Sequence, residues 1–388
     1  MRAPSPPFAM LRQAAREAHA RGEIARAIGL QTRVVNATPP DAATNADDVL
    51  FLCLLLHGTG RVAEGTSLLR DTLSRFPGNP ALHENLAVLL MAADDPKGAI
   101  SACETALALG AVSPNLHDCL CDAYSRTGRQ DLAIEAGRRA LDAKDLIFGA
   151  GRPIAAIPAA SPPAFDMTNP DENVIAYCLW GDQPRYQVPL LENARILPHL
   201  FPGWTIRVYH DTGAAPEYLT ALASHGVQLC PMALPAGVPA HRRLLWRFAV
   251  IADPGVKRFL IRDADSLLSV KERVAVDAWI NSPFHFHAMR DWYTHTDLLL
   301  AGMWGGSGGI LPAPETLMMN FKGWRVENDH IDQDVLSEMV WPIVRHDILV
   351  HDSVFTGCLG SVPFPPFGAL PPGSHIGQNA FPWFSPGR

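Results

Sequence analysis

Hydrophobic and polar positions in the first part of the chain follow a helical period, and the pattern itself repeats. The segments 47–80, 81–114 and 115–148 align without a gap at a period of 34 residues. The positions in register are Leu52, Leu86 and Leu120, then Gly65, Ala99 and Ala133, then Leu73, Leu107 and Leu141. Large residues on the packed faces and small ones where helices cross are what stacked helix pairs require. The pattern therefore predicts a helical-repeat array.

The repeat length and the spacing of these residues resemble the tetratricopeptide repeat, a helix-turn-helix unit of the same length. A looser unit at about 9–46 fits if its last loop is longer, because Gly22 then corresponds to Gly60 and Ala27 to Gly65. The resemblance implies an all-α repeat domain over residues 1–148. Such a domain can scaffold or dimerise the protein, or it can hold an acceptor or a protein partner, and the sequence leaves both readings open.

After the repeats the pattern changes to alternating strands and helices. Residues 149–173 contain five prolines and little periodicity, which predicts a linker over 149–172. Strands are predicted at 174–180, 205–211, 257–263 and 284–291, and helices at 185–200 and 241–253. The alternation predicts an α/β domain with a mostly parallel sheet over residues 173–388.

Acidic residues stand where the predicted strands end. Asp211, Asp263 and Asp291 each close a strand, and ligands of such sheets bind at the carboxyl ends of the strands. Asp263 and Asp265 form the closest acidic pair, in the stretch "FLIRDADS". Two like charges on one turn repel each other unless a cation lies between them, and oxygen ligands suit manganese or magnesium. We therefore expect a divalent-cation site at this edge.

The order of "VIAYCLWGDQPRY", "WTIRVYHD", "HRRLLWRFAV" and "FLIRDADS" is similar to that of the metal-dependent glycosyltransferases with the GT-A fold. The similarity spans about residues 174–384. It implies a Rossmann-like domain whose first strand and following loop hold the nucleotide. It also implies that the DxD motif, here Asp263 and Asp265, binds Mn²⁺ or Mg²⁺ and the diphosphate of a nucleotide-sugar donor.

Two later motifs are similar to elements of the retaining, family-8-like branch. "HIDQDVLSE" at 330–338 is similar to an element that contacts the donor sugar, which implies such a role for Asp332, Gln333 and Asp334. "SHIGQNAFPW" at 374–383 is similar to a C-terminal motif whose histidine is the third protein ligand of the metal, which implies that role for His375.

The second motif departs from the family pattern at one position that bears on the donor. Phe381 stands where that branch has a lysine that meets a phosphate. A basic residue elsewhere is therefore expected to take its place, with Arg247 and Arg262 as the candidates.

The candidate site residues fall into three groups. The catalytic or sugar-facing candidates are Asp291, Asp332, Gln333 and Asp334. The candidates for nucleotide-sugar binding are Tyr177, Trp180, Arg243, Arg247, Arg262, Asp263 and Gly302. The candidate metal ligands are Asp263, Asp265 and His375. The glycines between 302 and 309 are predicted to open a loop that forms the floor and rim of the sugar and acceptor pocket.

Several of these residues have a structural reading beside the functional one. Asp332 and Asp334 also suit the first turn of a helix, where acidic residues favour the helix dipole. The arginines at 243 and 247 either hold a phosphate or extend along a helix face. His351 and Asp352 could act together as a general base, could contact the acceptor, or could hydrogen-bond to the metal ligands. The sequence does not choose among these roles.

Composition narrows the setting. A chain of 388 residues with 48% apolar and 18% charged residues suits two packed domains. The formal net charge of −7 and the lack of a basic block argue against nucleic acid as a partner. Seven scattered cysteines suit reduced thiols in a cytoplasmic protein. The most apolar run, residues 49–56, is too short for a membrane span, and no membrane-spanning segment is expected.

The resemblance implies a glycosyltransferase, hexosyltransferase-like, that moves a sugar from a nucleotide sugar to a glycan acceptor, by analogy a cell-surface glycan. The configuration is retained if the family-8-like motifs hold, and inverted if Asp291, Asp334 or Asp352 acts as a base. The alternatives are a protein O-glycosyltransferase whose repeats hold the acceptor, a non-catalytic adaptor, and a metal hydrolase built on "HFH" at 285–287. The O-GlcNAc transferases also join helical repeats to a sugar transferase, but their fold is metal-free and the DxD motif separates them.

Overall fold

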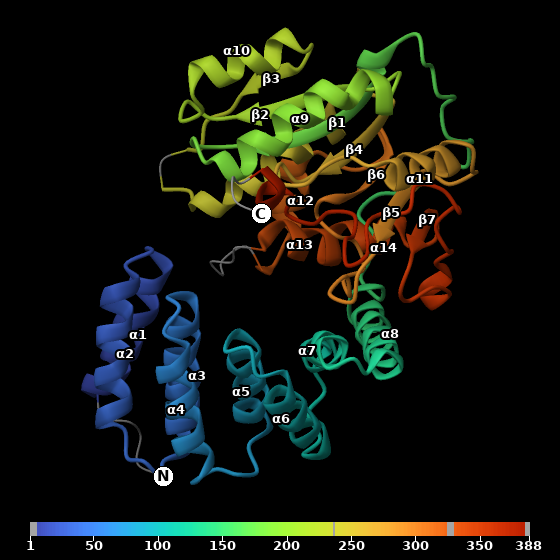
Figure 1. The fold of residues 1–388 in the computed structure, drawn as a ribbon. Coiled ribbons are helices and arrows are strands. Elements are labelled where there is room, and N and C mark those ends of the chain that lie inside the picture. The colour runs from blue at the N-terminus through green and yellow to red at the C-terminus, as the bar shows by residue number, and fades with distance from the viewer. Residues whose placement is uncertain (1–5, 236, 324–329, 385–388) are drawn as a thin grey trace. The chain divides into compact units, whose positions relative to one another are not determined.

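A computed structural model describes residues 6–235, 237–323 and 330–384 of the chain. The chain divides into two compact units, Met1–Ala140 and Leu141–Arg388. Helices make up the described part of the first unit, and a seven-stranded sheet with its helices makes up that of the second (Figure 1).

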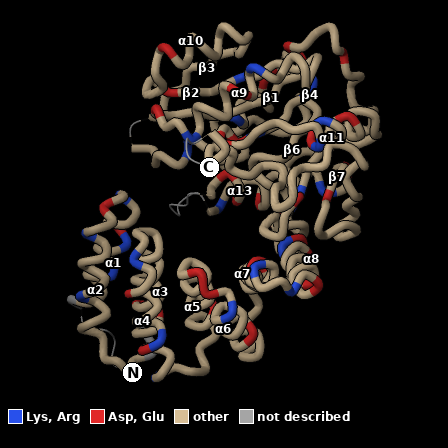
Figure 2. The backbone as a smooth tube through the Cα atoms, in the orientation of Figure 1, with Lys and Arg blue, Asp and Glu red and all other residues tan. Residues whose placement is uncertain are grey.

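The described part of the first unit consists of consecutive helix pairs, which confirms the predicted repeats, including the looser one near the start. The helices, of which the last runs on into the second unit, are α1 (Pro6–Ala20), α2 (Ile24–Ala37), α3 (Ala43–Gly58), α4 (Val62–Leu73), α5 (Pro80–Ala92), α6 (Pro96–Ala108), α7 (Pro114–Arg126) and α8 (Gln130–Phe148). Lys and Arg residues and Asp and Glu residues are spread along the backbone of these helices (Figure 2).

The turn inside each pair uses one backbone conformation. Gly22, Gly60 and Gly128 follow the first helices of their pairs with φ of 71°, 73° and 75°. Asp94 takes the corresponding place after α5 with φ 58°. A residue in the left-handed region ends a helix by redirecting the chain, and aspartate is one of the few other residues that tolerate it. Equivalent turn residues in the repeats therefore share the same left-handed backbone conformation.

Small residues in the repeats stand where neighbouring helices approach. A Cβ added at Gly65 of α4 would lie 2.8 Å from a methyl group of Leu89 in α5. The corresponding Ala99 and Ala133 are fully buried. The small side chains predicted from the sequence therefore permit the close packing of successive helices.

The second unit begins inside α8. Asp145 accepts hydrogen bonds of 2.7 Å from the guanidinium of Arg345 and from the indole N–H of Trp341. Lys144 pairs with Asp297 at 2.6 Å. The last turns of α8 thus belong to the packing of the second unit, and so does the Pro-rich segment that follows, since Arg258 donates to the carbonyl of Pro163 at 2.6 Å.

The sheet of the second unit is mostly parallel, as predicted. Its strands are β1 (Asn173–Leu179), β2 (Thr205–His210), β3 (Gln228–Pro231), β4 (Arg258–Arg262), β5 (Phe286–Arg290), β6 (Met303–Ser307) and β7 (Ile348–Asp352), in the order β3-β2-β1-β4-β6-β5-β7. Among the described strands only β6 runs antiparallel to its neighbours. The carboxyl ends of the other strands therefore meet at one edge.

Helices and short helical turns connect the strands. The helices are α9 (Pro184–Leu200), α10 (Pro216–Ser224), α11 (Val270–Ile280), α12 (Pro314–Asn320), α13 (Ile331–Val335) and α14 (Trp341–Val344). The 3-10 segments are η1 (Pro170–Glu172), η2 (Ala240–Ala252), η5 (Cys358–Gly360) and η6 (Phe381–Phe384), and η4 (Leu336–Val340) is a π turn. Buried apolar residues of β1, β2, β4 and α9 form the main core of the unit.

The glycine-rich segment 302–309 corrects one prediction, because its centre is strand β6 and not an open loop. A Cβ at Gly305 would lie 2.4 Å from the carbonyl oxygen of Phe259, and one at Gly306 would lie 2.4 Å from the ring of Phe286. The glycines let β6 pass between β4 and β5 under these aromatic residues. A cluster of glycines can therefore indicate close backbone packing within a sheet as well as a flexible loop.

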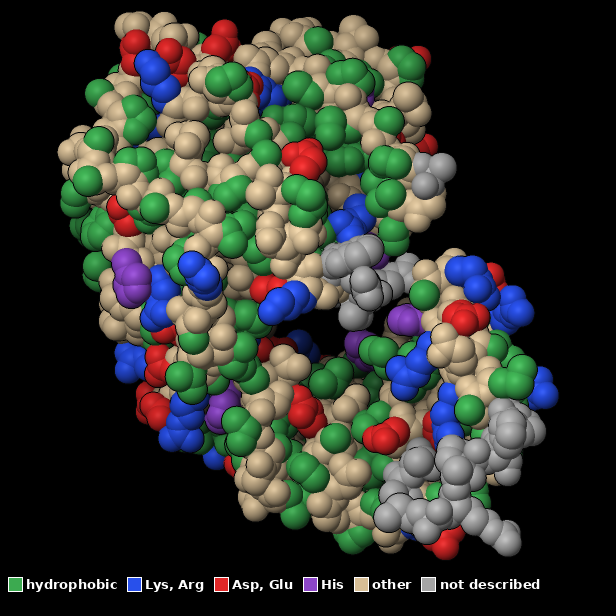
Figure 3. Space-filling model, turned by 180° about the vertical axis from the view of Figure 1, so that it is seen from behind, with side chains coloured by type: hydrophobic (Ala, Val, Ile, Leu, Met, Phe, Trp, Pro, Cys, Tyr) green, Lys and Arg blue, Asp and Glu red, His purple; other side chains and the backbone are tan. Residues whose placement is uncertain are grey.

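Two features of the structure bear on the expectations drawn from composition, namely the distribution of surface charge and the length of the apolar helices. On the face shown in Figure 3, acidic and basic side chains are interspersed. None of the helices in the described part of the chain is both long enough and apolar enough to cross a membrane.

Candidate functional site

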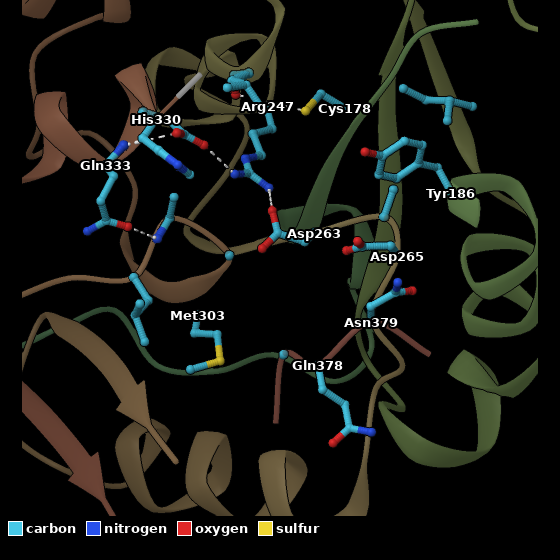
Figure 4. A pocket seen from close by; sticks show the side chains of 18 of the residues that line it. Cys178, Tyr186, Arg247, Asp263, Asp265, Met303, His330, Gln333, Gln378 and Asn379 are labelled. Carbon is cyan, nitrogen blue, oxygen red and sulfur yellow. Dashed lines mark hydrogen bonds and ion pairs between the residues drawn. The ribbon is translucent and has the colours of Figure 1, made fainter. Parts of the chain in front are cut away.

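A cavity of about 710 Å³ opens at the carboxyl edge of the sheet, in the second unit. Its walls come from the ends of β1 and β4, the start of α9, η2, the loop before β6, α13 and the C-terminal segment (Figure 4). This is the edge at which ligands of parallel sheets bind. The volume lies in the usual range for small-molecule and cofactor sites.

Asp263 and Asp265 follow β4 and both line the cavity. Arg247 of η2 donates to Asp263 through Nη1 and to Asp332 through Nη2, the latter at 2.7 Å. Arg185, in the first turn of α9, pairs with Asp265 at 2.8 Å. Each member of the acidic pair is thus already held by one arginine.

The electrostatics of these pairs follow from their burial. Burial raises the pKa of Asp265, Arg185 lowers it again, and the like charge of Asp263 adds to the rise. Burial lowers the pKa of Arg247, but Asp263 and Asp332 outweigh burial and hold it above its usual value. Arg247 therefore stays charged, and the acidic pair has the mutual repulsion expected from the sequence.

Asp332 and Gln333 of α13 reach the same cavity. The side-chain oxygen of Gln333 accepts from the backbone N–H of Ala301 at 3.0 Å, and its amide donates to the carbonyl of Leu299. Asp332 accepts from Arg247 and from the N–H of Gln333. Asp332 thus lies in the first turn of α13 and also lines the cavity, so its position is compatible with both the helix-terminus role and the site role.

Gly302 lies against the acidic pair. A Cβ at this position would lie 1.9 Å from Oδ2 of Asp263. The Asp263 carboxylate therefore occupies the space that a side chain at position 302 would fill. This gives Gly302, a residue predicted to bind the donor, a steric function in the site.

Residues 374–384, named here the C-terminal strap, cross the cavity and contribute His375, Gly377, Gln378 and Asn379 to its wall. The N–H of Ala380 donates to the carbonyl of Asp265 at 2.8 Å. The ring of His375 stacks on Trp292 at 5.1 Å between centroids. The strap thus brings the predicted histidine to the cavity that holds the acidic pair.

Asp291 anchors this strap from behind. Its Oδ2 accepts from the N–H of Ile376 at 2.9 Å, and its Oδ1 accepts from Lys271 and Ser353. Its carboxylate is 2% exposed and does not line the cavity. In the structure Asp291 therefore supports the strap and does not face the space where a sugar would bind.

Other predicted residues also lie away from the cavity. Tyr177 is fully buried in the core, and Arg262 is buried against Glu272 and the carbonyl of Trp304. Arg243 lies 3.8 Å from Asp211, outside the cavity wall, and Asp334 is exposed on the other side of α13. The phosphate role considered for Arg262 is not available to a side chain held in this way.

The pair His351 and Asp352, left open by the sequence, belongs to the core of the unit. Asp352 is fully buried and accepts from Arg290 at 2.7 Å, and His351 lies 2.9 Å from the imidazole of His287. His285, the other histidine of "HFH", contacts Asp347. These contacts hold β5 to β7 and do not open onto the cavity.

The donor atoms at the cavity fit a divalent cation chemically. Two carboxylates and one imidazole are the ligand types that manganese accepts. His375 Nδ1 lies 2.9 Å from the carbonyl of Ile376, and a proton on Nδ1 leaves Nε2 as the ligating atom. Among the described residues, however, no three such side chains are gathered into a preformed cluster, so Asp263 and Asp265 would have to loosen from their arginines to bind a cation.

Sequence reasoning missed several residues of the wall, including Arg185, Tyr186, His241 and His330. Two of them carry a signal that could have been used. Pro184 is a typical first residue of a helix, so Arg185 and Tyr186 fall in its first turn, next to the edge where the strands end. His241 and His330 become neighbours of the acidic pair only through the fold.

No family model and no curated protein matches the chain. A variant of O-GlcNAc transferase from Thermobaculum terrenum is 19% identical, with a TM-score of 0.41, over 68% of this chain and 47% of that one. MamA from Desulfovibrio magneticus is 16% identical, with a TM-score of 0.33, over 36% of this chain and 77% of that one. A tetratricopeptide repeat protein from Parabacteroides merdae is 16% identical, with a TM-score of 0.32, over 35% of this chain and 52% of that one. Because these scores lie below 0.5, function is argued from the residues of the chain itself.

Proposed function

We propose that the second unit is a metal-dependent glycosyltransferase that takes a sugar from a nucleotide sugar bound in the cavity and transfers it to an acceptor hydroxyl. One observation carries the proposal. Asp263 and Asp265, which close a buried strand, share a 710 Å³ cavity at the carboxyl edge of the sheet with the buried Arg247 and with Asp332. The cavity is large enough for a nucleotide sugar, and its acidic pair suits a cation that accompanies a diphosphate.

The cation would be Mn²⁺ or Mg²⁺ held by Asp263, Asp265 and His375. When bound, it neutralises the charge that develops on a departing nucleoside diphosphate. The protein's own contribution is position. Gly302 leaves room for the Asp263 carboxylate, and the strap brings His375 into the wall of the same cavity.

The remaining wall can orient the nucleotide and the sugar. Trp180 and Tyr186 come from the segment after β1 and offer aromatic faces to a base. Gln333 is fixed by its hydrogen bonds to the loop before β6, and Asp332 is fixed by Arg247. These two polar groups are proposed to bind the sugar hydroxyls, because both are held rigidly at the same wall.

The acceptor is proposed to be a glycan, with a protein acceptor held by the repeats as the second candidate. The repeat unit would then serve as a partner, acceptor or homodimer surface. None of the three candidate bases is placed to act on the sugar, so the proposal does not specify retention or inversion at the anomeric carbon. Asp291 and Asp352 are engaged in buried contacts, and Asp334 lies outside the cavity.

The test is release of nucleoside diphosphate from a panel of UDP-, GDP- and ADP-sugars, with Mn²⁺ and with EDTA. We expect Mn²⁺-dependent release with one donor and a loss of at least about a hundredfold in Asp265→Asn, in line with removal of a ligand of a catalytic metal. Asp297→Asn, which changes an aspartate outside the cavity, is the matched control. Full activity in EDTA would remove the metal from the proposal. Binding of no nucleotide in thermal shift would favour the adaptor reading.

A further inference from the structure

The cavity needs a basic group that can meet a diphosphate, if the proposed function holds. Among the residues that the structure describes, the lysine and arginine side chains in the cavity wall are Arg185 and Arg247. Phe381 stands where the similar family motif has a lysine, and Arg262 is buried elsewhere. The choice therefore lies between these two arginines.

Both terminal nitrogens of Arg247 are engaged by the protein. Its side chain is 2% exposed, and its guanidinium donates to Asp263, to Asp332 and to the carbonyl of Arg262. Turning it toward a ligand would take its donor away from the buried Asp332 carboxylate and from the carbonyl of Arg262, and would break its pair with Asp263. Such a loss is costly, so Arg247 acts as a fixed part of the wall.

Arg185 is placed differently. Its side chain is 50% exposed, and its ion pair is with Asp265, at 2.8 and 3.2 Å through two nitrogens. It stands in the first turn of the 17-residue helix α9, where the helix dipole disfavours a positive charge. In the structure the carboxylate of Asp265 supplies the negative charge that stabilises it there.

Asp265 is also a proposed ligand of the cation. Both hydrogen bonds of Arg185 go to Oδ2 of Asp265. A cation on this carboxylate takes up its negative charge and repels the guanidinium, so it competes with Arg185. Once the carboxylate is engaged, Arg185 keeps the exposure and the side-chain length to turn toward a second anion near the cation. The diphosphate of the donor is that anion.

We propose that Arg185 is the diphosphate-binding residue of the site and that it changes partners. It pairs with Asp265 until this carboxylate binds the cation, and then donates its guanidinium N–H groups to the diphosphate. This rests on the proposed function and deepens it, because it assigns recognition of the diphosphate to a residue of the β1–α9 segment. A guanidinium suits the role since it can give two parallel hydrogen bonds to phosphate oxygens.

The exchange makes two measurements move in opposite directions. In Arg185→Gln, Mn²⁺ alone should bind about threefold more tightly, because a competitor for Asp265 is gone. At saturating Mn²⁺, the nucleoside diphosphate of UDP, GDP and ADP that binds best should bind about tenfold more weakly, because a charge-assisted hydrogen bond is lost. Free Mn²⁺ is followed by electron paramagnetic resonance and the nucleotide by calorimetry, both on the full chain.

The matched control is Arg195→Gln. Arg195 lies on the same helix, is 55% exposed and pairs with Glu192 at 3.4 Å, so it matches Arg185 in charge and exposure. It should change neither affinity. Arg185→Lys keeps the charge but loses the two parallel hydrogen bonds of the guanidinium, so it should recover only part of the nucleotide affinity. Its Mn²⁺ affinity should stay near that of the natural chain.

The outcomes separate this inference from the proposed function. Should Arg185→Gln bind the nucleoside diphosphate as Arg195→Gln does, Arg185 does not meet the diphosphate, although the proposed function stands. Weaker binding of both Mn²⁺ and nucleotide would show that Arg185 only holds Asp265 in place, which also overturns the exchange. If the natural chain binds no nucleoside diphosphate at all, the proposed function itself fails.

Discussion

At the cavity, the charge and position of a side chain depend on the residues that contact it. Asp265 faces an arginine, a second aspartate and the backbone of the strap, which together decide its charge and position. Its place at the edge of the sheet could be expected from "RDADS", but its partners could not, since Arg185 is far away in the sequence. At this scale the sequence identifies residue types, and the fold determines their neighbours.

A second pair of titratable residues, His287 and His351, lies between β5 and β7. Burial lowers the pKa of His351 to about 4 and that of His287 well below its usual value of 6.5, and the charges of His351 and Arg262 add to the fall for His287. The ring of His287 stacks on Trp279, and that of His351 lies against Phe364. Both histidines are therefore neutral in the folded chain near pH 7.

Acid should destabilise the second unit through this pair. Between the unfolded pKa of 6.5 and the folded pKa of about 4, the unfolded chain binds more protons, so the free energy of unfolding falls as the pH falls. One such histidine contributes a slope of up to roughly 1.4 kcal/mol per pH unit. His351→Gln should reduce this slope between pH 6.5 and 4.5, even if it lowers stability at pH 7.

Urea unfolding followed by tryptophan fluorescence measures this, because all nine tryptophans lie in the second unit. His225→Gln, at an exposed histidine, is the control and should leave the slope unchanged. A slope that is the same in His351→Gln and in the natural chain would show that the pair does not couple protonation to folding.

At the scale of elements, the C-terminal strap links the sheet to the cavity. It is held at Ile376 by Asp291 and at Ala380 by the carbonyl of Asp265. Asp291 directly follows β5 and was predicted from its position at the end of a strand to face a sugar. The sequence placed it at the right edge of the sheet, but the strap lies between it and the cavity.

Asp291→Ala should release the strap. It removes the acceptor for the N–H of Ile376 and leaves Lys271 without its buried partner, which costs roughly 3 kcal/mol. We expect faster hydrogen exchange in a peptide covering residues 374–380, and weaker Mn²⁺ binding because His375 is no longer held. Mass spectrometry of exchanged peptides measures the first effect.

The control for this change is Asp297→Ala, which removes the partner of Lys144 at a place outside the cavity. It should leave exchange in the strap unchanged. If Asp291→Ala loses nucleotide-sugar turnover while the strap exchanges as before, Asp291 meets the donor directly, as its position after a strand first indicated.

At the scale of the molecule, the end of the repeats and the start of the sheet unit share helix α8. The composition of the chain changes after residue 148, where prolines begin, and a boundary there is the natural prediction. The contacts of Asp145 and Lys144 with Arg345, Trp341 and Asp297 show why packing can divide the chain earlier. A continuous helix contains no sequence signal for the point at which its packing partner changes.

Two fragments test this division. Residues 141–388 should unfold at a temperature about 5 °C higher than residues 149–388, because the shorter fragment loses contacts worth roughly 2 kcal/mol. Asp145→Ala in the longer fragment should give part of that loss. Equal unfolding temperatures would place the boundary at residue 148. Because the described cavity wall lies in residues 178–379, both fragments should still bind the nucleoside diphosphate if they fold.

The sequence by itself determined the repeat array, the mostly parallel sheet and the edge at which Asp263 stands. These depend on the periods of helices and strands and on chain direction, which are local properties. Tertiary structure decided which basic residues face the acidic pair, that Asp291 supports a strap, and that the glycines of β6 form a strand. Those outcomes depend on contacts between segments distant in the chain, and no local pattern encodes the distance between two side chains that only the fold brings together.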